Sequence, residues 1–506
     1  MRHTLLLLSL ALALLACSDD PKQPSALPAE DVGVDANADG ANADDAGDDD
    51  AATDHDAAND AGPVATVDAD DTDTGETPPN IAAVLDCGDT IPGGAGPGEL
   101  QRYALDTTAF PDAVCNDGTP ATVYFRPYRG EANRDRWVIN LRGGGSCGSG
   151  ASCAARWCSC ATARKCPHAE VTTNFGTNNM SANLKDTTDG GGMLRRDHPQ
   201  DDNPIEDYNQ VRITYCSSDG WGGTRRNVIQ ETVNPVTGAP VRYSIHFLGR
   251  RILDSAVAVL RPDGADPLHF TLNGADTELP DLDDAVDVII AGDSAGGAGV
   301  IANLDQLAGS LRAHNTRCAQ GNDCPLEVRG VLDAIVGPDK STFDYSEHVL
   351  GEFGVVDYST WTQAAELSGR PRGQMSDESC QTWHETHRQG TVSECSDLSH
   401  VIRHHVTTPF FVRMALLDGL ISNNYLKEML IDPEFGALTL QIFALRLQQE
   451  LSAFPMLSET AEEGAEMPVA PGVFAPECSK HDTIWDDAEV FDSTIPPLRR
   501  RPAPLV

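Results

Sequence analysis

Residues 287–300 have the sequence DVIIAGDSAGGAGV and decide the fold. The β-branched run at the start is typical of a buried parallel strand, and the small residues at the end allow a helix to pack closely against a sheet. Between them lies G-x-S-x-G, in which Gly292 and Gly296 permit a sharp turn that exposes the hydroxyl of Ser294 above the strand end. The stretch therefore predicts strand, tight turn and helix, with Ser294 as a candidate nucleophile rather than part of a structural loop.

A second motif supplies the amide donors that such a serine needs. The apolar run WVINL at residues 137–141 predicts another strand, and Arg142-Gly143-Gly144-Gly145 follows it. An oxyanion hole of this type uses the amide after the nucleophile and amides of an earlier glycine-rich loop. We predict that Gly143, Gly144 and Ala295 form it. The alternative is that the glycines only make a flexible turn.

The amino terminus carries an export signal. Arg2 and His3 precede an apolar run that is too short to span a bilayer and ends in Leu14-Leu15-Ala16-Cys17. This pattern predicts a lipoprotein signal peptide over residues 1–16 and lipidation of Cys17, which would anchor the chain to a membrane. The alternative is an ordinary cleaved signal that happens to contain a cysteine.

Residues 17–80 differ in composition from the rest of the chain. Positions 18–80 hold 19 acidic residues and one base, Lys22, with almost no large apolar side chains. Such a segment cannot bury enough surface to fold, so we predict a disordered tether, followed by a folded domain over residues 81–506. A calcium-binding repeat is the alternative, but the glycine-containing loop of a calcium hand is missing. The net charge of −41 argues against a nucleic-acid partner.

Fourteen cysteines in an exported chain predict disulfides. With Cys17 lipidated, thirteen remain, so we expect one free thiol. The residues Cys147, Cys153, Cys158, Cys160 and Cys166, with His168 nearby, also suggest zinc. Their spacings do not make two regular CxxC knuckles, and we therefore predict disulfides and no metal.

Taken together, four blocks resemble the pectin acetylesterase and Notum group of serine carboxylesterases. They are residues 138–147, residues 211–223 with YCSSDGW, the serine turn, and CSKH at residues 478–481. Residues 246–251, HFLGRR, are also similar to a helix start in that family. The resemblance implies an α/β-hydrolase-like fold with a mostly parallel central sheet, helices on both faces and loop insertions stapled by disulfides.

The resemblance also implies a Ser, Asp, His triad. It assigns the acid to Asp333, at the end of a strand-like run, and the base to His481, and this chain order fits α/β-hydrolase topology. From the residues alone other assignments stay open, with His404 and His405 as rival bases and Asp339 and Asp418 as rival acids.

Two departures from the family pattern concern substrate binding. The family commonly has an acidic residue before the glycines and a tryptophan after them, where this chain has Arg142 and Gly145-Ser146. Trp221 is therefore expected to line the acyl site in place of the absent tryptophan, with a wider acyl site as the alternative. Asp219 is a candidate substrate contact, with a structural role as the alternative.

The resulting expectation is a monomeric carboxylic ester hydrolase that needs no cofactor or metal. Its substrate would be an acyl ester, acetyl by resemblance, on a partner such as an acetylated polysaccharide. It would be exported to a bacterial cell envelope, at the outer membrane or cell surface. Two alternatives remain: a serine peptidase or thioesterase using the same triad, and a non-catalytic surface binding protein on the same fold.

Overall fold

The computed structural model describes residues 77–87, 100–173, 176, 179–182, 184–188, 190–197, 203–261, 269–272, 275–318, 324–342, 358–387, 390–426, 436–454 and 470–484. The predicted signal peptide, Cys17 and all but the last four residues of the predicted tether lie outside the described residues.

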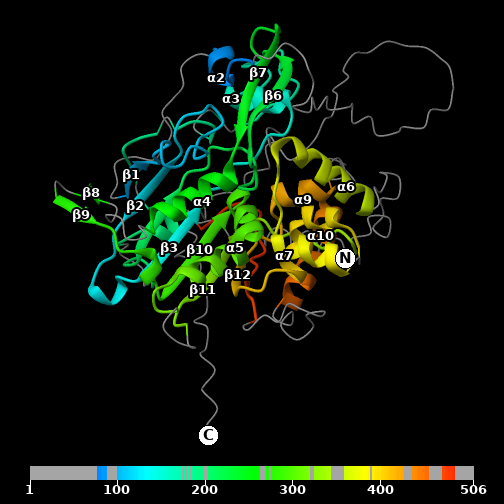
Figure 1. Cartoon of the computed structure of the whole chain (residues 1–506). Helices are drawn as coiled ribbons and strands as arrows, with labels where there is room; N and C mark the ends of the chain where they lie inside the picture. The colour runs from blue at the N-terminus through cyan, green and yellow to red at the C-terminus, as the bar shows by residue number, and fades with distance from the viewer. Residues whose placement is uncertain are drawn as a thin grey trace, which may run out of the picture.

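A nine-stranded sheet forms the centre of the molecule, in the order β13-β12-β11-β10-β3-β5-β2-β1-β4 (Figure 1). The six strands from β13 to β5 are parallel, and β2, β1 and β4 continue the sheet antiparallel at one edge. The strands are β1 Leu100–Ala104, β2 Thr122–Arg126, β3 Arg136–Leu141, β4 Thr187–Thr188, β5 Asn209–Ile213, β10 Asp287–Asp293, β11 Glu327–Asp333, β12 Phe410–Arg413 and β13 Gly472–Phe474. The predicted mostly parallel α/β sheet is thus confirmed.

Helices and two hairpins surround this sheet. The α-helices are α2 Ile81–Val84, α3 Gly150–Trp157, α4 Gly249–Val259, α5 Ala295–His314, α6 Tyr358–Gly369, α7 Glu378–His387, α8 Leu398–His404, α9 Gly419–Leu426 and α10 Gly436–Ala453. The hairpins are β6 Arg225–Val233 with β7 Pro240–Phe247, and β8 His269–Leu272 with β9 Ala275–Glu278. Among the described helices, none combines the length and apolarity needed to cross a membrane.

The two faces of the sheet are covered differently. Side chains alternate along β3, so Trp137 and Ile139 join a large core with α4 and α5, while Val138 points to the other face. Figure 1 shows α4 and α5 lying across β3 and β10. On the second face, the described core residues come from strands, from the short 3₁₀ turn Gly192–Leu194 and from loops, including Tyr208 and Ile484. Helices on both faces were expected, but no described α-helix contributes to this second core.

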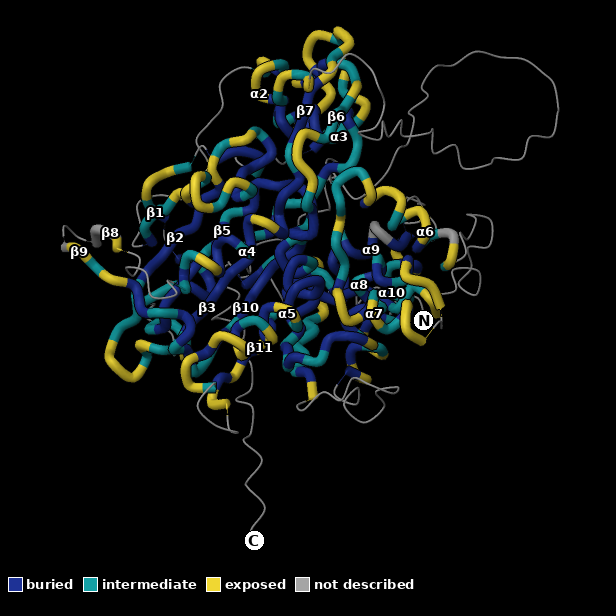
Figure 2. Tube along the Cα trace, in the orientation of Figure 1, coloured by how far each residue is buried: buried dark blue, intermediate teal, exposed yellow. Residues whose placement is uncertain are grey.

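Disulfides staple the loop insertions, as predicted. Figure 2 shows the buried trace concentrated in the sheet, with exposed segments at the β6–β7 end. Near that end, the cysteines that had suggested zinc are disulfide-bonded, which leaves no thiolate for a metal. Among the described residues, disulfides join Cys87–Cys158, Cys115–Cys216, Cys147–Cys153, Cys160–Cys166, Cys318–Cys324 and Cys380–Cys395. None of the described cysteines is free, so the expected unpaired thiol is not found there.

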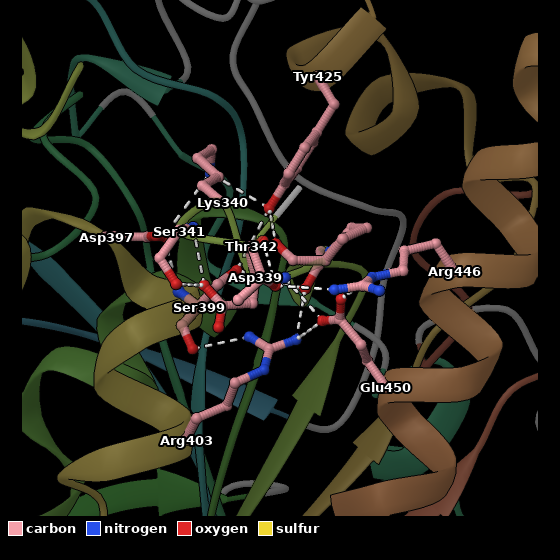
Figure 3. Close-up of polar contacts among 12 residues, drawn as sticks. Asp339, Lys340, Ser341, Thr342, Asp397, Ser399, Arg403, Tyr425, Arg446 and Glu450 are labelled. Atoms are coloured by element: carbon pink, nitrogen blue, oxygen red, sulfur yellow. Dashed lines mark hydrogen bonds and ion pairs between the residues drawn. The ribbon is translucent and has the colours of Figure 1, made fainter. Parts of the chain in front are cut away.

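A polar network fastens the helical part of the molecule to the segment that follows β11 (Figure 3). Lys340 lies 3.6 Å from the carboxylate of Asp397 and 4.3 Å from the ring centre of Tyr425. Tyr425 donates its hydroxyl to the carbonyl of Pro338 at 2.6 Å, and Arg403 pairs with Glu450 at 2.7 Å. Through these contacts, α8, α9 and α10 are held together around one end of the sheet.

We predict that Gly299 in α5 cannot carry a larger side chain. A Cβ at this position would lie 2.6 Å from the Trp221 ring, whereas a Cβ at Gly309 in the same helix would meet nothing within 4 Å. Gly299→Ala should destabilise the fold by about 1–3 kcal/mol through overpacking, and Gly309→Ala should stabilise it by up to about 1 kcal/mol. Urea unfolding of the two variants measures the difference; equal stability would contradict the packing described.

Candidate active site

Ser294 occupies a strained turn between β10 and α5. Its backbone has φ 50° and ψ −121°, a conformation that L-residues rarely adopt and that is typical of a nucleophile elbow. The flanking glycines are required, because a Cβ at Gly292 would collide with the carbonyl of Gly296, and one at Gly296 with the carbonyl of Leu141. The sequence stretch thus folds as predicted, into strand, tight turn and helix.

The glycine loop after β3 runs beside this serine. The strand order reverses between β3 and β10. The glycine loop and the Ser294 turn therefore leave the sheet at its topological switch point, where ligands bind in open α/β sheets. A Cβ on Gly143 would lie 3.1 Å from the Cβ of Ser294. The Gly143 amide, however, donates to the Asp293 carboxylate at 3.2 Å. Of the three predicted oxyanion donors, Gly143 is therefore already engaged, which favours Gly144 and Ala295.

His481 is paired with Asp418. Its Nδ1 lies 2.7 Å from Oδ2 of this carboxylate, which is fully buried. Oδ1 of Asp418 accepts the amides of Leu420 and Ile421 at 2.9 and 3.0 Å, at the start of α9. The carboxylate is fixed on both oxygens and can orient the imidazole. Nε2 of His481 lies 3.1 Å from the carboxylate of Asp482.

Asp333, the acid assigned from the family resemblance, has different partners. Its Oδ1 pairs with Arg413 at 3.2 Å, and its Oδ2 accepts the amides of Thr483 and Ile484 at 2.6 and 2.9 Å. Its backbone carbonyl also accepts the amide of Ser294 at 2.9 Å. These bonds favour Asp418 over Asp333 as the acid: Asp418 is the carboxylate bonded to His481, and Asp333 joins the serine turn to the segment that carries the histidine.

The charges around the imidazole of His481 shift its pKa. Burial lowers the pKa of His481, but the hydrogen bond and charge of Asp418, with the charges of Asp482 and Asp333, outweigh burial, so the pKa is raised above its ordinary 6.5. Burial raises the pKa of Asp482 to about 6, against the lowering effect of His481. Burial also raises the pKa of Asp333, although Arg413 and the two amides favour its charged form.

The two residues expected to touch substrate are buried in the scaffold instead. Trp221 is fully buried, packs against Tyr215 with 5.3 Å between ring centres, and donates its indole N–H to the carbonyl of Arg142 at 3.0 Å. Asp219, also buried, accepts the Ser217 hydroxyl and the amides of Trp221 and Gly249 at 2.7–3.0 Å. These contacts favour the structural alternative for Asp219 and give Trp221 the role of supporting the glycine loop.

The rival bases and acids have other surroundings. His405 is buried among other histidines, and His404 is exposed on α8. Asp339 lies in the turn after β11, where it accepts the amide of Ser341 at 2.9 Å (Figure 3). Asp418 could have been preferred from the sequence because it follows the apolar run of β12. No sequence signal identified Asp293 and Asp482 as neighbours of the site.

A known protein family matches most of the chain. The family described as Pectinacetylesterase matches residues 98–500. The chain belongs to this family.

Curated relatives include the palmitoleoyl-protein carboxylesterase NOTUM of Drosophila melanogaster, which is 30% identical over 235 residues, covering 46% of this chain and 27% of the relative. The palmitoleoyl-protein carboxylesterase notum2 of Xenopus laevis is 30% identical over 237 residues, covering 47% of this chain and 36% of the relative. The matched part thus spans about a third or less of these relatives. Among solved structures, the Wnt deacylase Notum from Drosophila is similar with a TM-score of 0.49 and 22% identity, covering 77% of this chain and 88% of that one.

We predict that Asp333→Ala destabilises the protein by about 3 kcal/mol, because it leaves the buried Arg413 without this carboxylate and removes the acceptor of two amides. Asp186→Ala is the matched control: its carboxylate is 97% exposed and 3.7 Å from Arg102, so its loss should change stability by less than about 0.5 kcal/mol. Chemical denaturation measures both, and a similar small effect for the two variants would refute the structural role of Asp333.

Proposed function

We propose that this protein is a serine carboxylesterase that hydrolyses acyl esters through an acyl-enzyme on Ser294. The observation that carries the proposal is the strained Ser294 turn at the sheet's switch point, joined through Asp333 to the segment that holds the His481–Asp418 pair. A non-glycine residue in this conformation costs of order 1–3 kcal/mol, and such strain is concentrated at functional sites.

The proposed reaction uses these groups in turn. The Ser294 hydroxyl attacks the acyl carbon while Nε2 of His481 takes its proton, and Asp418 holds the Nδ1 proton and stabilises the imidazolium. Amides of Ala295 and Gly144 accept the negative charge that develops on the carbonyl oxygen. His481 then returns the proton to the leaving alcohol. A water molecule, deprotonated by the same imidazole, hydrolyses the acyl-enzyme and restores the serine.

The acyl group is proposed to be acetyl and the alcohol a sugar of a polysaccharide. The description of the family, Pectinacetylesterase, supports this choice. The named relatives act on a palmitoleoyl protein, which makes a long acyl chain the alternative. A peptidase or thioesterase would use the same groups, and a non-catalytic binding protein would need none of them.

An extracellular location is supported by the disulfides, which persist in oxidising compartments. Lipidation of Cys17 and the acidic tether remain part of the proposal, with the composition of residues 1–80 as their support. Such an arrangement would hold the esterase near a membrane while letting it reach polymers.

We expect Ser294 to react with a fluorophosphonate probe and the protein to hydrolyse short aryl esters and acetylated sugars. Ser294→Ala should abolish labelling and lower ester turnover by at least about 10⁴-fold. Ser452→Ala, on the exposed end of α10, is the control and should leave both unchanged. Side-by-side assays with acetyl and palmitoleoyl esters and with peptides separate the alternatives. Peptide cleavage without ester cleavage would contradict the esterase, and an unlabelled wild-type Ser294 would contradict catalysis by this serine.

The pH dependence tests the choice of acid. Because only neutral His481 can accept the serine proton and its pKa is raised, kcat/KM should fall as the pH drops through a midpoint above 6.5. Asp418→Asn should move that midpoint to lower pH and reduce kcat by roughly 10³–10⁴-fold. Asp333→Asn is the comparison, measured on the folded fraction. If it reduces kcat as strongly while Asp418→Asn does not, the acid is Asp333.

A further inference from the structure

Three histidines outside the esterase site point one nitrogen each at a common point. Nε2 of His400 in α8 lies 3.2 Å from Nε2 of His384 in α7 and 3.2 Å from Nε2 of His405, the residue that follows α8. His384 and His405 are buried, 4% and 6% exposed, and His400 is half-buried. We call His384, His400 and His405 the tri-histidine cluster.

The spacing of these nitrogens suits a tetrahedral metal ion. Zinc binds histidine nitrogen at about 2.0–2.1 Å, which in a tetrahedron sets neighbouring nitrogens about 3.3 Å apart. Two of the three separations are 3.2 Å, and all three nitrogens fall within 4.8 Å of one another. A small inward adjustment of one ring would give three ligands and leave the fourth position for water or a small anion.

Hydrogen bonding alone accounts poorly for this convergence. Nε2 of a neutral imidazole is either a donor or an acceptor. Nε2 of His400 faces two other Nε2 atoms, so it would have to share one proton or one lone pair between both neighbours. A cation at the centre accepts all three lone pairs at once.

The cluster is built on a rigid scaffold. The Cys380–Cys395 disulfide ties α7 to the turn before α8, and Asp397 caps α8 by accepting the amide of Ser399 at 3.0 Å. Because the sulfur of Cys380 is in a disulfide, it offers no thiolate, although it lies close to the three nitrogens. The ring of Trp383 packs on His384 and His405, with ring centres 4.9 and 5.7 Å apart.

This scaffold lies away from the serine. The amides of Thr407 and Thr408, just after the cluster, donate to Asp305 in α5 at 2.7 and 2.8 Å. Asp305 is eleven residues beyond Ser294 in the same helix, about 16 Å along its axis. An ion there would act on the packing of α7 and α8 and not on the ester.

We propose that His384, His400 and His405 bind a Zn²⁺ ion through their Nε2 atoms, and that the ion clamps α7 to α8. Imidazole ligands without a thiolate also suit Cu²⁺ and Ni²⁺, but the tetrahedral spacing favours Zn²⁺. The site does not depend on the esterase chemistry.

The test uses the full chain without a polyhistidine tag, stripped with a chelator and titrated with Zn²⁺, and with Co²⁺ as a spectroscopic probe. We expect one Zn²⁺ per chain, a raised melting temperature in the presence of Zn²⁺, and a Co²⁺ spectrum of a tetrahedral site with no thiolate charge-transfer band. His400→Ala should weaken Zn²⁺ binding by at least roughly 100-fold, and His384→Ala and His405→Ala similarly.

His387→Ala is the matched control. His387 is in the same helix, but it is exposed, stacks on Trp383 and lines an open hollow of 570 Å³ instead of facing the cluster. It should bind Zn²⁺ as the wild type does. The proposal is overturned if the stripped wild type binds Zn²⁺ no more tightly than His400→Ala, or if all three single variants keep the wild-type affinity. Should His384→Ala fail to fold, His400→Ala, at the half-buried position, decides the question.

Discussion

The buried carboxylate of Asp333 is the interaction on which the geometry of the site depends. The carboxylate meets the guanidinium of Arg413 on β12 and the amides of Thr483 and Ile484. The backbone carbonyl of the same residue accepts the amide of Ser294. The ends of β10, β11 and β12 and a segment near residue 480 are thereby fixed to one another. A charge so deeply buried persists only because it is paired and fully hydrogen-bonded.

This role explains why an aspartate at that position resembles a triad acid in the sequence. Parallel strands end at the same edge of the sheet, so Asp333 at the end of β11 and Asp418 after β12 both arrive near the histidine. Position along the chain cannot distinguish them, because the choice depends on which side chain meets Nδ1 of His481. Here Asp418, capping α9, makes that contact, and Asp333 serves the backbone.

The parts that could be predicted are those fixed by local steric rules. The Ser294 turn needs glycines at positions 292 and 296, and the sequence has glycine at both. The parallel sheet follows from the apolar runs of β3, β10 and β11. What could not be predicted depends on long-range packing: the burial of Trp221 against Gly299, the capture of the Gly143 amide by Asp293, and the absence of a described helix from the second core. The tri-histidine cluster was equally hidden, since His384 and His405 are 21 positions apart and meet only when α7 folds onto α8.

The buried carboxylates also set the pKa of His481. Asp333, Asp418 and Asp482 act on His481, while Arg142 and Arg413 supply the nearby positive charge. An imidazole in this setting is a stronger base than a free one, because its protonated form is stabilised by carboxylates that are already in place and need no reorganisation. Burial and the neighbouring imidazoles instead lower the pKa of His400 and His405. The pKa of the same side chain is thus shifted in opposite directions at the two places, and the difference lies in the neighbours that the fold brings to each.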